Sequence, residues 1–296
     1  MKTTITILFV LAGFCAAGVY RDAGLGMYPF LKMDVGARAA ALGGTGAVNG
    51  SELAVFSNPA LLAGAGSSVS AGYNQWYGST AQNYLTAVSG MGSDFTGSLA
   101  LRSVFTDGIE YRDSPTSDPL DTFSASDLSV NGAVAVRHGR FDIGAGLKVI
   151  HEKIWLETSN GWAVDIGFNY HPHPSLVFSA AYLHCGPSVT MDKTEFRLPR
   201  TWVFASRWNQ DLPLGTISLS GQVMRPLDNT TRAGAGLEYS PFKLVSLRGG
   251  WKFNDDSGGL TAGAGITAKG WILDYAFVPG DYSLGTAHRF SVSRSL

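Results

Sequence analysis

The sequence predicts an all-β protein, a transmembrane up-and-down antiparallel β-barrel of about 14 strands with a small N-terminal hatch segment. Three observations lead to this prediction. Short segments of alternating apolar and polar residues follow one another from about residue 67 onward, without a sustained helical period. The connections between them alternate between short and long, and their polar face carries charged residues. No apolar run reaches the roughly 18 residues that a transmembrane helix requires.

The first residues have the layout of a secretory signal peptide, which predicts an exported protein with a cleaved leader. Lys2 precedes an apolar run at Ile5–Phe14, and small residues follow at Cys15–Gly18. We therefore divide the chain into a signal peptide at 1–18, an N-terminal segment with the hatch at 19–66, and an outer-membrane β-barrel at 67–296.

Cysteine usage and charge narrow the functional classes. Only Cys185 remains after removal of the signal peptide, so no intramolecular disulfide can form. The net charge of -1 and the 15% of charged residues give no electrostatic reason to expect a nucleic acid as partner. Many of the 37 glycines fall on the polar faces of the segments, where they would leave space inside a barrel.

Residues 34–66 differ from the rest because they are rich in small residues and lack alternation. Residues 38–42 predict a short helical turn. A second turn is expected from Ser51, and it must end before Asn58, because the residue before a proline is disfavoured in a helix. Such a compact segment fits inside a barrel as a plug.

The alternation that predicts strands is clear at residues 141–150. Phe141, Ile143 and Leu147 fall on one face, whereas Asp142 and Lys148 fall on the other, because strand side chains alternate with period 2. About fourteen such segments occur, an even number as bacterial single-chain barrels require. They lie near 67–75, 83–89, 97–104, 127–137, 141–151, 161–171, 175–184, 199–208, 215–224, 231–240, 244–252, 259–267, 271–278 and 285–295.

The connections predict which end of the barrel faces which compartment. Short connections are expected at 91–94, 138–140, 172–174, 209–214, 241–243 and 268–270. Mostly longer ones are expected at 105–126, 152–160, 185–198, 226–230, 254–258 and 279–285. Tight periplasmic turns and longer extracellular loops are typical of outer-membrane barrels, so the C-terminus should lie at the periplasmic rim.

A secreted sandwich or propeller also has strands that alternate apolar and polar residues, but its apolar face points inward. The polar face of the segments therefore distinguishes a membrane barrel from these folds. Here the face assigned to the lumen carries nine charged residues, which suit a wet or ion-paired interior. They are Arg102, Arg137, Asp142, Lys148, Asp165, Arg232, Glu238, Arg248 and Asp274.

Three stretches of sequence resemble the PorV/PorQ family of outer-membrane proteins, within the wider group of FadL-like barrels. They are Gly36-Ala37-Arg38-Ala39-Ala40-Ala41-Leu42-Gly43-Gly44, Phe56-Ser57-Asn58-Pro59-Ala60-Leu61-Leu62-Ala63, and the ending from Leu273 to Arg289. The resemblance implies a fourteen-stranded barrel whose hatch carries the Asn-Pro-Ala motif. The hatch motif residues are then Gly36, Arg38, Gly43, Gly44, Asn58, Pro59 and Ala60.

Residue patterns for catalysis or metal binding are weak, so we expect no catalytic residues, no metal, no cofactor and no enzymatic activity. His171-Pro172-His173 falls in a predicted turn without a third ligand nearby. His184 and Cys185 are adjacent, and neighbouring strand residues point to opposite faces. Asp142 and Asp165 are expected to pair with lumen Arg and Lys residues.

Two functions stay open. The resemblance implies a component of type IX secretion, in which the barrel sits among outer-membrane lipids. Its loops 105–126 and 185–198 would then bind secreted cargo or an attachment complex. The alternative is a FadL-like channel for uptake of hydrophobic small molecules, gated by the hatch around Asn58-Pro59-Ala60.

Overall fold

The computed structural model describes residues 26–92, 94–115, 117–255, 258–280 and 285–296. The signal peptide predicted at 1–18 lies outside these residues, as do residues 19–25 of the predicted N-terminal segment.

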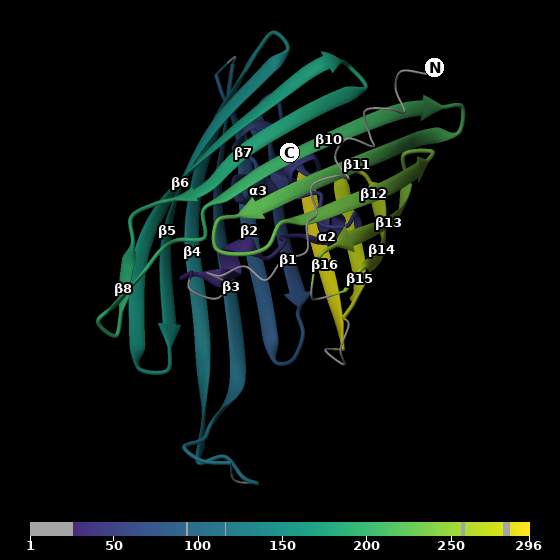
Figure 1. Cartoon of the computed structure of the whole chain (residues 1–296). Helices are drawn as coiled ribbons and strands as arrows, with labels where there is room; N and C mark the ends of the chain where they lie inside the picture. Colours follow the sequence, from purple (N-terminus) through teal and green to yellow (C-terminus); the bar gives the residue numbers. More distant parts are fainter. Residues whose placement is uncertain (1–25, 93, 116, 256–257, 281–284) are drawn as a thin grey trace.

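Fourteen strands in the described part of the chain form one closed antiparallel barrel, in which β1 pairs with β16 (Figure 1). The predicted fold class and strand number are therefore confirmed. The barrel strands are β1 (Ser68–Gln75), β2 (Thr80–Met91), β3 (Phe95–Tyr111), β4 (Asp121–His138), β5 (Phe141–Ile154), β6 (Glu157–His173), β7 (Leu176–Cys185), β10 (Thr201–Leu212), β11 (Gly215–Pro226), β12 (Arg232–Pro241), β13 (Val245–Phe253), β14 (Leu260–Ala268), β15 (Trp271–Pro279) and β16 (Thr286–Ser295).

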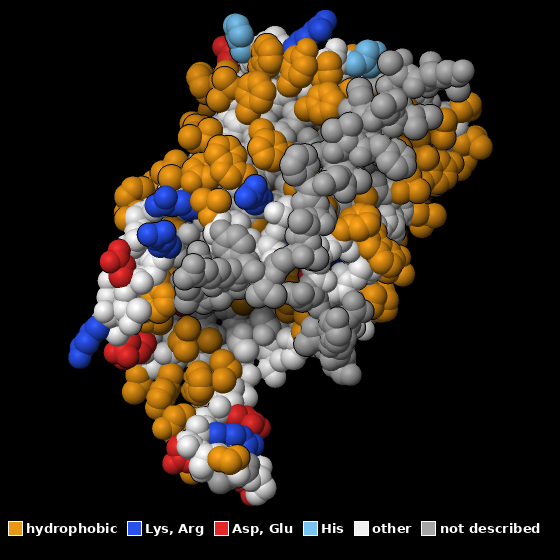
Figure 2. Space-filling model, viewed as in Figure 1, with side chains coloured by type: hydrophobic (Ala, Val, Ile, Leu, Met, Phe, Trp, Pro, Cys, Tyr) orange, Lys and Arg blue, Asp and Glu red, His pale blue; other side chains and the backbone are white. Residues whose placement is uncertain are grey.

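The outer face of the barrel is apolar and the inner face is polar. In β5, Phe141, Ile143 and Leu147 are exposed, whereas Asp142 and Lys148, on the alternate positions, are buried. Figure 2 shows hydrophobic side chains over much of the visible wall. This arrangement is the reverse of a soluble barrel and suits a wall surrounded by hydrocarbon.

Three connections differ from the prediction. The expected connection 152–160 is reduced to residues 155–156, because β5 continues to Ile154 and β6 begins at Glu157. The expected loop 105–126 is mostly strand, because β3 continues to Tyr111 and β4 begins at Asp121. The alternation fades there, although the ladder of paired residues continues past an irregularity between Thr106 and Ile109. The expected loop 185–198 contains a small separate hairpin of β8 (Val189–Met191) and β9 (Thr194–Phe196).

The segment before β1 lies inside the barrel and is built from short helical turns (Figure 1). They are η2 (Pro29–Lys32), α2 (Ala37–Ala41), η3 (Gly46–Val48), η4 (Ser51–Leu53), α3 (Ala54–Ser57) and η5 (Pro59–Leu62). We call residues 26–66 the hatch, which extends the predicted 34–66 towards the N-terminus. None of the helices in the described ranges has the length and apolar character to cross a membrane.

Candidate functional site

The hatch backbone touches the barrel wall where the wall carries glycine. At β5 and β6, Pro59 and Ala60 lie against Gly144 and Gly167. A Cβ on Gly144 would lie 2.5 Å from the Ala60 nitrogen, and a Cβ on Gly167 would collide with Asn58 Oδ1. Because glycine has no Cβ, the backbone of the Asn-Pro-Ala motif can contact the wall at these two positions.

A second close contact lies farther round the wall, where Leu42 and Gly43 meet β12 and β13. Gly43 has a φ of +69°, which only glycine adopts readily. A Cβ on Gly236 would lie 2.7 Å from the Leu42 carbonyl oxygen, and a Cβ on Gly250 would lie 2.5 Å from the Leu42 carbonyl carbon. The hatch thus contacts the wall at two separate places, between which β7, β10 and β11 lie in the ring.

Asn58 joins the hatch to the wall by hydrogen bonds. Its Oδ1 accepts from the Ala60 N–H at 3.1 Å, which caps η5, and its Nδ2 donates to Asn169 Oδ1 at 2.9 Å. Asp142 lies beside this pair and accepts from Arg137 Nε at 2.7 Å. Predicted hatch and lumen residues therefore form one network.

Arg38 connects α2 to a buried chain of charges on the wall. Its guanidinium donates to both oxygens of Glu238, at 3.0 and 2.8 Å. Glu238 also accepts from Arg248, which donates to Asp274 at 2.6 Å. Two guanidinium groups and two carboxylates balance one another here, as burial of charge requires.

Lys148, Asp165 and His184 form a third buried group. Lys148 Nζ lies 2.7 Å from Asp165 Oδ2 and 3.0 Å from His184 Nδ1. His184 has a φ of +61°, and its backbone N–H donates to Asp165 Oδ1 at 2.7 Å. In the sequence, His184 stands out only as the neighbour of Cys185. Its partner Lys148 lies 36 residues away, so no local pattern indicates the contact.

Residues 29–35, which we call the strap, cross the lumen near the end of the barrel that carries the longer connections. Ion pairs join the strap to the wall. Lys32 pairs with Asp228 at 2.6 Å, and Asp34 pairs with Lys252 at 2.7 Å. Burial raises the pKa of the Asp34 carboxyl, but the positive charges of Lys252 and Arg289 outweigh it, so that pKa lies below its usual value.

The lowered pKa predicts how the strap depends on pH. A carboxylate with a lowered folded-state pKa stabilises above its unfolded value of about 3.9, and the stabilisation is lost as pH falls through the folded value. We expect Asp34→Asn to weaken strap attachment by about 1–3 kcal/mol at pH 7. The difference from the parent should shrink below about pH 4.

Hydrogen exchange of the strap amides, corrected for intrinsic rates at each pH, measures this effect. Asp94→Asn in the exposed β2–β3 turn is the control and should leave strap exchange unchanged. Equal exchange in Asp34→Asn and the parent at pH 7 would show that the ion pair does not hold the strap.

Two neighbouring cavities lie beside the hatch. A vestibule of about 410 Å³ opens near the loops and is lined by charged residues, including Asp228, Arg232 and Lys252, together with Trp76. An inner chamber of about 60 Å³ lies deeper, between hatch and wall. Its lining combines apolar side chains, among them Leu31, Val35, Phe56, Leu183 and Val203, with polar ones such as Asp34, His184 and Gln222. Met33 and Met224 line both cavities.

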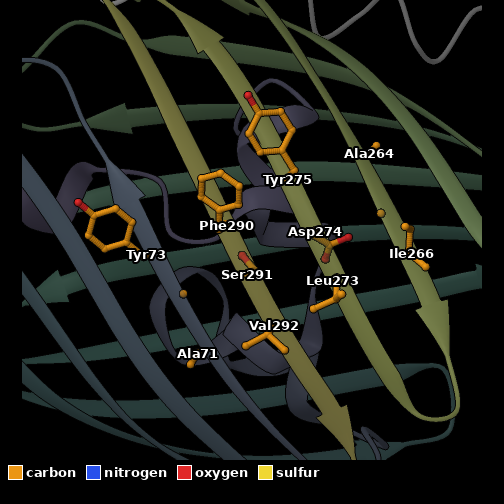
Figure 3. A pocket seen from close by; sticks show the side chains of 12 residues that line it. Ala71, Tyr73, Ala264, Ile266, Leu273, Asp274, Tyr275, Phe290, Ser291 and Val292 are labelled. Carbon is orange, nitrogen blue, oxygen red and sulfur yellow. The ribbon is translucent and has the colours of Figure 1, made fainter.

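A larger groove of about 660 Å³ lies on the outside of the wall (Figure 3). Tyr73, Leu273 and Phe290 line it and are exposed on the outer face. The ladders of β1 with β16 and of β15 with β16 run through it without a break. The groove is therefore a depression in the apolar outer surface, separated from the lumen by paired strands.

The remaining predicted residues occupy less central places. Arg232 lies 4.0 Å from Asp255 at the vestibule, and Arg102 donates to the Met33 carbonyl oxygen at 3.0 Å. Gly36 and Gly44 have φ values of +83° and +81° and form turns of the hatch. The wall glycines that receive the hatch were not singled out from the sequence, although their place on the polar face was the available signal.

No family model and no curated protein sequence matches the chain. Solved structures of hydrocarbon transporters are similar in fold. The toluene transporter TodX of P. putida is 13% identical, with a TM-score of 0.67 over 89% of this chain and 99% of that one. The toluene transporter TbuX of Ralstonia pickettii is 16% identical, with a TM-score of 0.63 over 89% and 98%. A FadL homologue of Pseudomonas aeruginosa is 10% identical, with a TM-score of 0.57 over 88% and 98%.

Proposed function

We propose that this chain is an outer-membrane channel for the uptake of hydrophobic small molecules. Its fold is that of FadL-like outer-membrane barrels. The observation that supports the proposal most directly is the inner chamber between hatch and wall, which shares the lining residues Met33 and Met224 with the vestibule. An apolar solute that leaves the vestibule would contact the apolar side chains of this chamber.

Transport through this path requires the hatch to move. The chamber of about 60 Å³ is smaller than the roughly 150 Å³ cavity that accepts benzene in an engineered protein core. Leu31, Val35 and Phe56 line the chamber, and all three belong to the hatch. A small displacement of the hatch would therefore widen the path without breaking the barrel ladder.

The type IX secretion hypothesis stays a prediction from the sequence resemblance. The structures that share this fold include toluene transporters and a monoaromatic hydrocarbon channel, which supports the uptake alternative. The loop 185–198, which the sequence predicts to meet protein partners, packs partly against the hatch. Val189 and Leu198 are buried in one cluster with Tyr28 and Phe30.

A substitution that fills the chamber should block uptake. Val203 is buried and faces the chamber, so Val203→Phe would occupy space that a solute must cross. We expect uptake of radiolabelled toluene, in cells that lack other such channels, to fall to the level of cells carrying an empty vector. The parent chain should restore uptake.

Phe204→Leu is the matched control, because Phe204 is the next residue on β10 and points outward. It should transport like the parent, and both variants should show the heat-modifiable migration of a folded barrel. Uptake by Val203→Phe equal to that of the parent would argue against this path. Failure of the parent itself to restore uptake would overturn the proposed function.

A further inference from the structure

The strands on one side of the barrel are much longer than those on the other. A strand that crosses a bilayer needs about 9–11 residues. β13, β14 and β15 have 9 residues each, whereas β3 has 17 and β4 has 18. At about 3.3 Å per residue, the excess extends up to about 20 Å beyond the membrane. Figure 1 shows the β3–β4 hairpin reaching past the other hairpins.

Aromatic residues gather on this raised part. The Trp155 ring lies 5.1 Å from Tyr111 and 5.9 Å from Phe123, between ring centroids. Trp155 is 46% exposed and the neighbouring Leu156 is 76% exposed. We call Tyr111, Phe123, Trp155 and Leu156 the shelf. Because they stand above the membrane, these apolar groups face water, and such a patch marks an interaction site.

The charges around the shelf indicate what binds there. Residues 107–121 contain five acidic residues and one arginine, a surplus of four negative charges in a chain whose net charge is -1. The arginine, Arg112, pairs with Glu110 at 2.8 Å. Figure 2 shows acidic side chains at the tip of the hairpin. Anionic lipid headgroups would be repelled from this tip, whereas a cationic surface would be attracted.

The shelf also has a defined orientation. Thr106 pairs with Ala125, and Ile109 pairs with Phe123, so Phe123 lies on the sheet face that continues the lumen side. A molecule on the shelf would therefore overhang the mouth of the barrel. An aromatic core bordered by charges is the usual composition of a protein-binding surface.

We propose that the shelf binds a protein partner that presents basic residues around an apolar side chain. The inference rests on the membrane location of the barrel and is independent of solute uptake. The aromatic rings supply the buried contact, and the acidic hairpin supplies attraction and orientation.

The test uses the full chain in nanodiscs of zwitterionic phosphatidylcholine. The probe is a fluorescent peptide of alternating lysine and tyrosine, compared with the same peptide carrying glutamate instead of lysine, with binding to empty discs subtracted. We expect the lysine peptide alone to bind, and more weakly at 0.5 M salt because salt screens exposed charges. The double variant Tyr111→Ser/Trp155→Ser should lower its affinity about tenfold or more.

A second variant separates charge from apolar contact. Asp113→Asn/Asp118→Asn/Asp121→Asn should weaken binding of the lysine peptide at low salt, and little at high salt. Phe242→Asn, an exposed site in the turn at the opposite end of the barrel, is the control and should bind like the parent. Toluene uptake should be unchanged in all three variants.

Three results would overturn the proposal: equal binding of the glutamate peptide, unchanged affinity in the shelf variant, or no response to salt. A neutral naphthylamine dye bound at the shelf, lost in Tyr111→Ser/Trp155→Ser and unaffected by the aspartate changes, would instead assign the shelf to apolar solutes.

Discussion

Replacement of Gly250 by valine is expected to release the hatch from the wall of an otherwise intact barrel. The new side chain would meet the backbone of Leu42 and Gly43, and it would enter the space of the Thr261 hydroxyl. That hydroxyl accepts from the Gly43 N–H at 3.1 Å and donates to the Ala41 carbonyl oxygen at 3.0 Å. Overpacking destabilises a protein by about 1–3 kcal/mol where the neighbouring side chains can adjust. Here the neighbours are mainly backbone atoms, which adjust less readily, so the hatch contact should be lost.

Two measurements on purified protein check this expectation. Trypsin should cut the variant at Lys32 or Arg38 while the barrel keeps its heat-modifiable migration, and single-channel conductance in planar bilayers should rise. The matched control is Gly249→Val on the same strand, because a Cβ at Gly249 meets nothing within 4 Å. If both variants are equally protected and equally conducting, the glycine contacts do not hold the hatch.

Glu238→Gln is expected to lower the free energy of unfolding by about 3–5 kcal/mol, because it leaves a buried charge without its partner. Arg38 would lose its carboxylate, whereas Arg248 would keep Asp274. Glu110→Gln provides the comparison, since its pair with Arg112 is exposed and such pairs contribute about 0–1 kcal/mol.

Rates of thermal unfolding in detergent at one temperature compare the variants, because membrane barrels seldom unfold reversibly. Arg38→Met completes a double-mutant cycle, and the double variant should lose less than the sum of the single losses. A Glu238→Gln variant no less stable than Glu110→Gln would mean that the buried network contributes little to stability.

The barrel could be predicted from sequence because its surroundings impose a simple rule. Wherever a strand contacts hydrocarbon, outward residues are apolar and the period of 2 is visible, as in β5 and β6. Beyond the membrane this rule ends, although strand pairing continues. For that reason residues 105–111 and 121–126 were predicted as loop and are strand.

The interior was predictable only in part. Alternation assigns Glu238 and Arg248 to the lumen but does not show that Glu238 also binds Arg38 of the hatch. Likewise, it places Gly144 and Gly250 on the inner face without showing which segment approaches them. These contacts join residues some 80 to 210 positions apart. They depend on how the closed barrel aligns its strands around the hatch, which no local pattern contains.

The contacts of the hatch with both sides of the wall constrain the order of assembly. The hatch directly precedes β1, and β1 closes the ring by pairing with β16 from Ser68–Ser295 to Gln75–His288. A folded hatch could not be threaded through the finished ring past Gly144 on one side and Gly250 on the other. Either the seam between the first and last strands closes around a folded hatch, or the hatch folds within the closed ring, so the hatch and the barrel must reach their final contacts together.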